Sequence, residues 1–161
     1  MGIVSIAVDL NVDDDAFIRA PVALVYGHLA DPARYVAWWP GFVPRPTAPR
    51  FGLSQVGKDA LDEVVFTLRG RGPSLRMGFR AHSFRPNAGL HLDLGGDILG
   101  RAEWWLEEGF GGTVIHHLVW AAAERRPLTL LAAYRASLRR ALWSLKDQLQ
   151  SQVRTGAGLA P

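Results

Sequence analysis

Residues 127–153 read PLTLLAAYRASLRRALWSLKDQLQSQV, and this stretch decides the fold. Proline suits the first position of a helix, which is where Pro127 stands. At about 1.5 Å per residue the helix would be roughly 40 Å long, enough to cross a whole sheet. Charged and amide side chains separate apolar residues that recur at helical spacing: Leu131, Tyr134, Leu138, Leu142, Leu145, Leu149 and Val153. The stretch therefore predicts a long amphipathic helix with one face packed against the rest of the protein.

The preceding segment, 61–123, consists of short apolar runs separated by turn clusters rich in glycine. This texture predicts an antiparallel meander of strands. The other face of the first runs is mostly polar, as in a sheet with one buried side. The residues expected on the buried face of these runs are Val64, Phe66, Leu68, Leu75, Met77, Phe79, Ala81, Leu90, Leu92, Leu94, Ala102, Trp104 and Leu106.

The last apolar run, 113–119, is apolar on both faces. Alternation alone leaves open which set points inward, because a shift of one residue exchanges the two faces of a strand. We place Ile115 and His117 inward. The alternative inward set contains Val114 and His116.

Shorter elements precede the meander. Alternation predicts a strand over 15–20, which Pro21 ends. Proline then favours the start of a helix over 21–30, and a second, brief helix follows over 32–38. The proline-rich residues 40–49 are expected to form a loop.

The length of 161 residues and the composition indicate one globular domain. We place this domain at 1–154 and expect a frayed tail at 155–161. The chain has no cysteine, so disulfides and thiolate sites are excluded and a cytoplasmic location is expected. No segment has the length and apolarity of a membrane span. The net charge is +3, but the arginines are scattered rather than gathered into a basic stripe, so we predict no binding of nucleic acid.

The order of these elements resembles the START and birch-pollen-allergen-like (SRPBCC) superfamily, specifically its bacterial polyketide cyclase/dehydrase-like group. The phrases that carry the resemblance are FIRAP at 17–21 running into VY at 25–26, LADP at 29–32 through Tyr35 to WWP at 38–40, EWWLE at 103–107, and GGT at 111–113. The resemblance implies an α+β helix-grip fold, in which a curved antiparallel sheet wraps around a long C-terminal helix and two short helices follow the first strand. It also implies a deep cavity between sheet and helix. Members of the group include aromatases, cyclases, lipid and quinone carriers and receptors.

Our leading hypothesis is therefore a protein that binds a small hydrophobic molecule, such as a lipid, a quinone or a polyketide-like compound, in that cavity. Apolar walls with a few polar groups are typical of such pockets. The residues expected to contact the ligand are Trp38, Trp39, Phe42, Phe66, Leu68, Met77, Phe79, Leu92, Trp104, Ile115, Leu131 and Leu138. In similar proteins the region of Trp38 and Trp39 lies over one mouth of the cavity, so these residues form either a lid or a plug at the end of the core.

An enzymatic alternative is a polyketide aromatase/cyclase that uses His117, Tyr134 and Arg135. Cyclisation needs a proton acceptor with a pKa near neutrality and a donor that stabilises an enolate oxygen, roles suited to histidine and to tyrosine or arginine. The competing interpretation makes His117 and Tyr134 core residues and Arg135 a solvated flank.

No cofactor is predicted, and no metal site. His116 and His117 are adjacent, and neighbouring residues of a strand point to opposite faces, so the two rings are poorly placed to share an ion. A third interpretation is a homodimer formed through Trp105 and Trp120 on the outer face of the sheet.

Overall fold

The computed structural model describes residues 10–45 and 63–156, with side chains from residue 13 onward. Seven strands form one sheet, and the order of strands across it is β1-β7-β6-β5-β4-β3-β2. Every neighbouring pair is antiparallel. The elements in chain order are β1 (Leu10–Ile18), α1 (Val22–Leu29), the 3-10 helix η1 (Pro32–Ala37), β2 (Phe42–Pro44), β3 (Val64–Leu68), β4 (Leu75–Arg85), β5 (Gly89–Gly96), β6 (Leu99–Gly109), β7 (Gly112–Ala122) and α2 (Pro127–Arg154).

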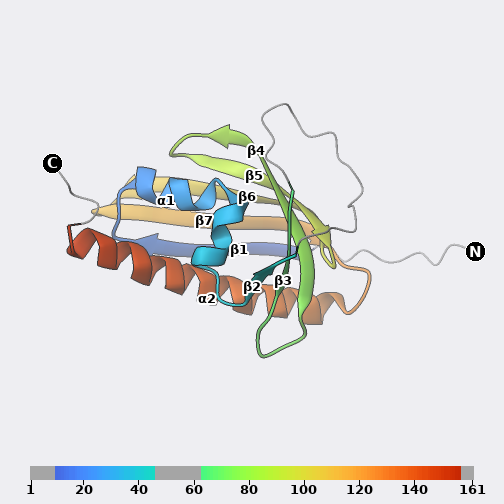
Figure 1. Ribbon diagram of the computed structural model, residues 1–161. Coiled ribbons are helices and arrows are strands. Elements are labelled where there is room, and N and C mark those ends of the chain that lie inside the picture. Colours follow the sequence, from blue (N-terminus) through green and yellow to red (C-terminus); the bar gives the residue numbers. More distant parts are fainter. Residues whose placement is uncertain (1–9, 46–62, 157–161) are drawn as a thin grey trace, which may run out of the picture.

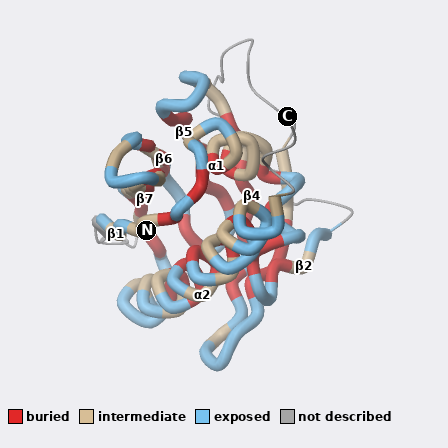
Figure 2. Tube along the Cα trace, turned by 90° about the vertical axis from the view of Figure 1, so that its left-hand side faces the viewer, coloured by how far each residue is buried: buried red, intermediate tan, exposed pale blue. Residues whose placement is uncertain are grey.

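The sheet curves around one side of the long helix α2, and the short helices α1 and η1 lie over the C-terminal half of that helix (Figure 1). Seen from the side, the buried segments gather between α2 and the strands, while the outward surfaces of the helix are exposed (Figure 2). This arrangement is the helix-grip fold, and it confirms the expected α+β class. The core therefore lies between the inner face of the sheet and α2.

The inner face has the composition that alternation predicts. The predicted inward residues of β4, β5 and β6 are buried, and so are Phe66 and Leu68 on β3. On β7 the buried set contains Ile115 and His117, whereas Val114 and His116 are only partly buried. Strand pairing decides which face of β7 is buried, because cross-strand partners lie on the same face of a sheet. His117 pairs with Asp14 on β1 and with the buried Trp104 on β6.

Two strands differ from the expectation. β1 begins at Leu10 rather than at residue 15, and it pairs with β7 along its whole length. The three aspartates at 13–15 hid it from an analysis based on alternation, because charged residues are tolerated on an edge strand. β2 lies inside the expected loop and pairs with β3 through Phe42 and Leu68. Residues 46–49 of that loop and 157–161 of the expected tail lie outside the described residues.

The helix α2 runs one residue beyond the predicted end, and the start of its buried stripe needs a correction. Leu130 is buried, whereas Leu131 is only half-buried. The buried stripe continues through Tyr134 and Leu138, spaced four residues apart, and Leu130 is in phase with that spacing. Leu131 therefore lies at the border of the core.

Candidate functional site

Aromatic side chains fill much of the interior between α2 and the sheet. Trp38 and Trp39 are both buried, with ring centroids 5.6 Å apart and the planes inclined by 29°. Trp39 in turn contacts Tyr134 on α2, with centroids 6.2 Å apart. The same cluster contains Tyr35, Phe42, Phe66 and Phe79. The two tryptophans are thus packed within the aromatic cluster of the core.

Buried polar atoms in this cluster are paired across elements. The indole Nε1 of Trp39 donates to Ser137 Oγ on α2 over 2.8 Å. The indole Nε1 of Trp104 donates to the hydroxyl of Tyr35 over 3.1 Å, and that hydroxyl donates to the backbone carbonyl of Leu29. Each tryptophan therefore has a partner for its N–H group, which would be costly to bury alone.

The structure brings together two of the three proposed catalytic residues. Nε2 of His117 lies 2.8 Å from the hydroxyl of Tyr134, and the His117 ring packs on Trp104 with centroids 3.9 Å apart. Both His117 and Tyr134 are buried. Nδ1 of His117 makes no hydrogen bond of standard geometry with any described residue.

Burial sets the protonation of this pair. It lowers the pKa of His117 to about 3, against smaller opposing effects from Asp14 and the backbone of Glu103. Burial likewise raises the pKa of Tyr134 well above its usual range, and Asp14 adds to that shift. Both groups are therefore neutral at pH 7, and neither has the near-neutral pKa that suits a general base or acid. His117 and Tyr134 are therefore joined by a buried hydrogen bond between two neutral groups.

Tyr134→Phe should accordingly destabilise the fold. It removes the partner of Nε2 of His117 inside the core, and an unsatisfied buried polar group costs about 1–3 kcal/mol. Tyr26→Phe is the matched control, because Tyr26 is partly exposed and its change should stay within about 0.5 kcal/mol. Urea unfolding of the two variants measures the difference. Equal, small losses would contradict the assignment of a stabilising hydrogen bond to Tyr134.

Arg135, the third proposed catalytic residue, lies elsewhere. Its Nε and Nη2 donate to the carboxylate of Asp14 over 3.3 and 3.2 Å, and its side chain is 39% exposed. The Asp14 side chain is 14% exposed and also lies 4.0 Å from Arg139. Arg135 therefore ties α2 to the edge strand β1 through Asp14, the cross-strand partner of His117.

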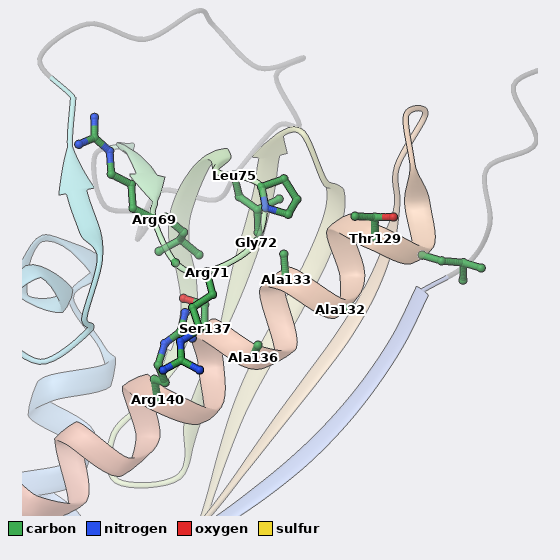
Figure 3. Close-up of a pocket in the computed structure, with 14 residues that line it drawn as sticks. Arg69, Arg71, Gly72, Leu75, Thr129, Ala132, Ala133, Ala136, Ser137 and Arg140 are labelled. Atoms are coloured by element: carbon green, nitrogen blue, oxygen red, sulfur yellow. The ribbon is translucent and has the colours of Figure 1, made fainter.

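A pocket of about 530 Å³ opens between the connection from β3 to β4 and the first half of α2 (Figure 3). Leu68 and Leu75 line it from the sheet. Ala133 and Ser137 line it from the helix, and Leu128 stands at the start of that helix. Volumes of roughly 300–1,000 Å³ with mostly apolar walls are typical of small-molecule sites. The volume and the walls of this pocket are therefore those of a small-molecule site.

Most residues predicted to contact a ligand do not line this pocket. Leu68 does; Phe66, Met77, Phe79, Leu92, Trp104, Ile115 and Leu138 are packed in the core, with Trp38, Trp39 and Phe42 beside them. Ligand contact by these residues stays a prediction. The pocket instead uses small residues of α2 that sequence reasoning missed, Ala132, Ala133 and Ala136 among them. The sequence could have indicated them, because these alanines form a strip of small residues between the leucine stripe and the charged face of the helix.

The outer face of the sheet carries Trp105 and Trp120, as expected. Each is covered by an arginine: Arg85 lies 5.4 Å from the Trp105 ring and Arg101 lies 5.2 Å from the Trp120 ring. Glu103 lies on the same face, two residues before Trp105 on β6, and accepts a hydrogen bond from the Trp105 indole. Association of two chains through this face stays a prediction.

The described residues contain neither a cluster of metal-ligating side chains nor a membrane-spanning helix. Within 10–45 and 63–156, no three histidine or acidic side chains are grouped so that they could hold an ion. None of the helices described has both the length and the apolarity to cross a bilayer.

Fold and pocket together define a helix-grip domain with an open apolar pocket at one end of the long helix. A comparison by sequence finds no matching family model and no matching curated protein. Solved structures are nevertheless similar in fold. The Zhui aromatase/cyclase from Streptomyces sp. R1128 is 14% identical with a TM-score of 0.65, and the match covers 91% of this chain and 96% of that one.

Other similar structures have different descriptions. Protein Ms6760 from Mycobacterium smegmatis is 15% identical over 89% of this chain and 92% of that one, with a TM-score of 0.64. The Aha1 dimer from Colwellia psychrerythraea is 18% identical over 88% of this chain and 96% of that one, with a TM-score of 0.55. At these identities the likeness establishes the shared fold, and one fold serves many functions.

Proposed function

We propose that this protein binds a small, largely apolar molecule in the pocket between the β3–β4 connection and the first half of α2. The observation that carries the proposal is the pocket itself, with its volume of about 530 Å³ and its walls of leucine and alanine. A pocket of this kind exposes apolar surface that a ligand would remove from water, at about 25 cal/mol per Å². The resemblance of the sequence to the SRPBCC superfamily, whose members include lipid and quinone carriers, supports the same function.

The position of the pocket also suits binding. Its floor includes Leu68 and Leu75, which are buried at the end of the core, so the floor is held in place by the packed sheet. Its other wall is one face of a helix whose far side packs on the same core. Two rigid elements thus face each other across the pocket, and a preformed site loses less conformational entropy on binding than a mobile one.

A direct test fills the pocket. Ala136 is an exposed position of α2 that lines it, so Ala136→Trp should occupy the space without disturbing the core. We expect binding of the neutral apolar probe N-phenyl-1-naphthylamine, followed by its fluorescence, to weaken by about tenfold, which corresponds to about 1.4 kcal/mol.

The matched control is Gln152→Trp, at an exposed position near the other end of the same helix. It adds the same ring but should leave binding unchanged. Equal affinities of Ala136→Trp, Gln152→Trp and the unaltered protein would contradict the proposed site. Mass spectrometry of the natively purified protein then identifies any molecule that occupies the pocket.

The alternative function is that of an aromatase/cyclase, the description given to the Zhui protein. A hydrogen-bonded His117–Tyr134 pair is the observation in its favour. Both side chains are buried, however, and neither lines the pocket, so a bound molecule there would not touch the pair. Binding is therefore the function that the geometry supports best.

A further inference from the structure

We infer that the ligand of this pocket is an amphipathic anion, whose charged group is held by Arg71, Arg140 and Ser137 and whose apolar part extends toward Leu128. This inference rests on the proposed function and adds the chemical class of the ligand. It starts from the charge of the walls. Of the described residues, three arginines line the pocket, and no aspartate or glutamate does.

Two of these arginines, Arg71 and Arg140, differ from others in having no acidic partner among the described residues. Arg80 pairs with Glu63, and Arg135 pairs with Asp14. Neither Arg71 nor Arg140 forms an ion pair with any residue that the structure describes. Guanidinium groups stay charged at all relevant pH values. Unpaired cations beside an apolar pocket leave an electrostatic site that an anion would complete.

The close-up shows which arginines can take part. Arg71 and Arg140 lie together beside Ser137 at one end of the pocket, whereas the side chain of Arg69 extends away from it (Figure 3). Arg140 is partly buried, and its Nη2 lies so close to Gly70 that a Cβ there would collide with it. The β3–β4 connection thus passes tightly over the Arg140 guanidinium and brings Arg71 to the same end.

Ser137 adds a neutral donor to this end. It is 3% exposed, it lines the pocket, and its Oγ accepts the hydrogen bond from Trp39. A hydroxyl also has one proton to donate, and no described residue accepts it. The end of the pocket therefore presents two guanidinium groups and an O–H donor, a set that matches an acceptor-only group such as a carboxylate.

The other end of the pocket is apolar. Leu128 is 72% exposed although it is a large hydrophobic residue, and it stands on the first turn of α2 beside Thr129 and Ala132. Cations at one end and uncovered apolar surface at the other match a molecule with a charged head and a hydrocarbon tail. An entirely neutral ligand would leave the arginine end unused.

The test compares decanoate with 1-decanol, which has the same chain length but no charge. Isothermal titration calorimetry of the unaltered protein at low salt should show decanoate binding at least about tenfold more tightly, because charge-assisted hydrogen bonds are roughly twice as strong as neutral ones. Arg140→Met and Arg71→Met should each weaken decanoate binding about tenfold and leave decanol binding unchanged. Ser137→Ala should weaken decanoate binding about threefold.

Arg154→Met is the matched control, because it removes the same charge from an exposed side chain at the end of α2 that does not line the pocket. It should change neither affinity by more than about twofold, because Arg154 stands roughly 20 Å along the helix from Arg140. If Arg154→Met weakens decanoate binding as much as Arg140→Met, the effect is one of net charge, and the inference is overturned. Equal binding of decanoate and decanol, abolished by Ala136→Trp, would overturn the anion and keep the pocket. Binding of neither probe would refute both proposals.

Discussion

Replacing Trp104 by alanine is expected to lower the free energy of unfolding by about 4 kcal/mol, which is a large share of the stability of a typical domain. The Trp104 indole is buried, packs on the His117 ring with centroids 3.9 Å apart, and donates a hydrogen bond to the hydroxyl of Tyr35. Its removal leaves a cavity and takes one hydrogen-bond donor from the hydroxyl of Tyr35. Urea denaturation followed by far-UV circular dichroism measures the loss.

Trp105→Ala is the control, one residue further along the same strand. Its ring lies on the outer face, partly exposed, with Arg85 above it and a 2.7 Å hydrogen bond to Glu103. Losing these contacts should cost less than about 2 kcal/mol. Similar losses for the two variants would mean that Trp104 is not packed in a filled core. A low cost for Trp104→Ala alone would instead favour a ligand-filled interior with Trp104 as one of its walls.

The second large effect is a dependence of stability on pH that His117 carries. Its pKa is about 3 in the folded protein and 6.5 when unperturbed. Between these values the unfolded state binds a proton that the folded state does not, so the stability falls as the pH is lowered from 6.5 toward 3. The slope is at most about 1.4 kcal/mol per pH unit, which amounts to roughly 2 kcal/mol between pH 6.5 and 4.5.

His117→Gln isolates this effect. Glutamine is polar but does not titrate, so the variant is expected to be less stable at pH 7 and to lose less stability on acidification than the unaltered protein. Any contribution of other groups to the pH dependence is common to both proteins and cancels in the difference. Parallel curves of unfolding free energy against pH would show that His117 is not buried in its neutral form.

Much of the fold followed from local patterns. The leucine spacing of 127–153 predicted α2 almost to its ends, and alternation predicted the inward residues of β4, β5 and β6. These predictions succeeded because burial on one face imposes a period of 3.6 residues on a helix and of two on a strand. β1 was predicted too short and β2 was missed, because edge strands are held by backbone pairing, which imposes no hydrophobic period.

The candidate site was less accessible to sequence reasoning. Its arginines, Arg71 and Arg140, are separated along the chain by the four strands β4 to β7, and Ser137 is a single polar residue between apolar residues of the long helix. Apolar wall residues were proposed by position on the inner face, but an inner face supplies both core and cavity. Which of the two a residue serves depends on how closely the opposite elements approach.

The sequence by itself determined the class of fold, the long helix, the inward faces of the middle strands and the absence of thiol chemistry. Tertiary structure decided which face of β7 is buried, that His117 is paired with Tyr134, that Arg135 reaches Asp14, and where the pocket opens. The physical reason is the separation along the chain of the residues that interact. Periodicity records whether a residue is buried, whereas pairing and empty volume depend on elements far apart in the chain that only packing brings together.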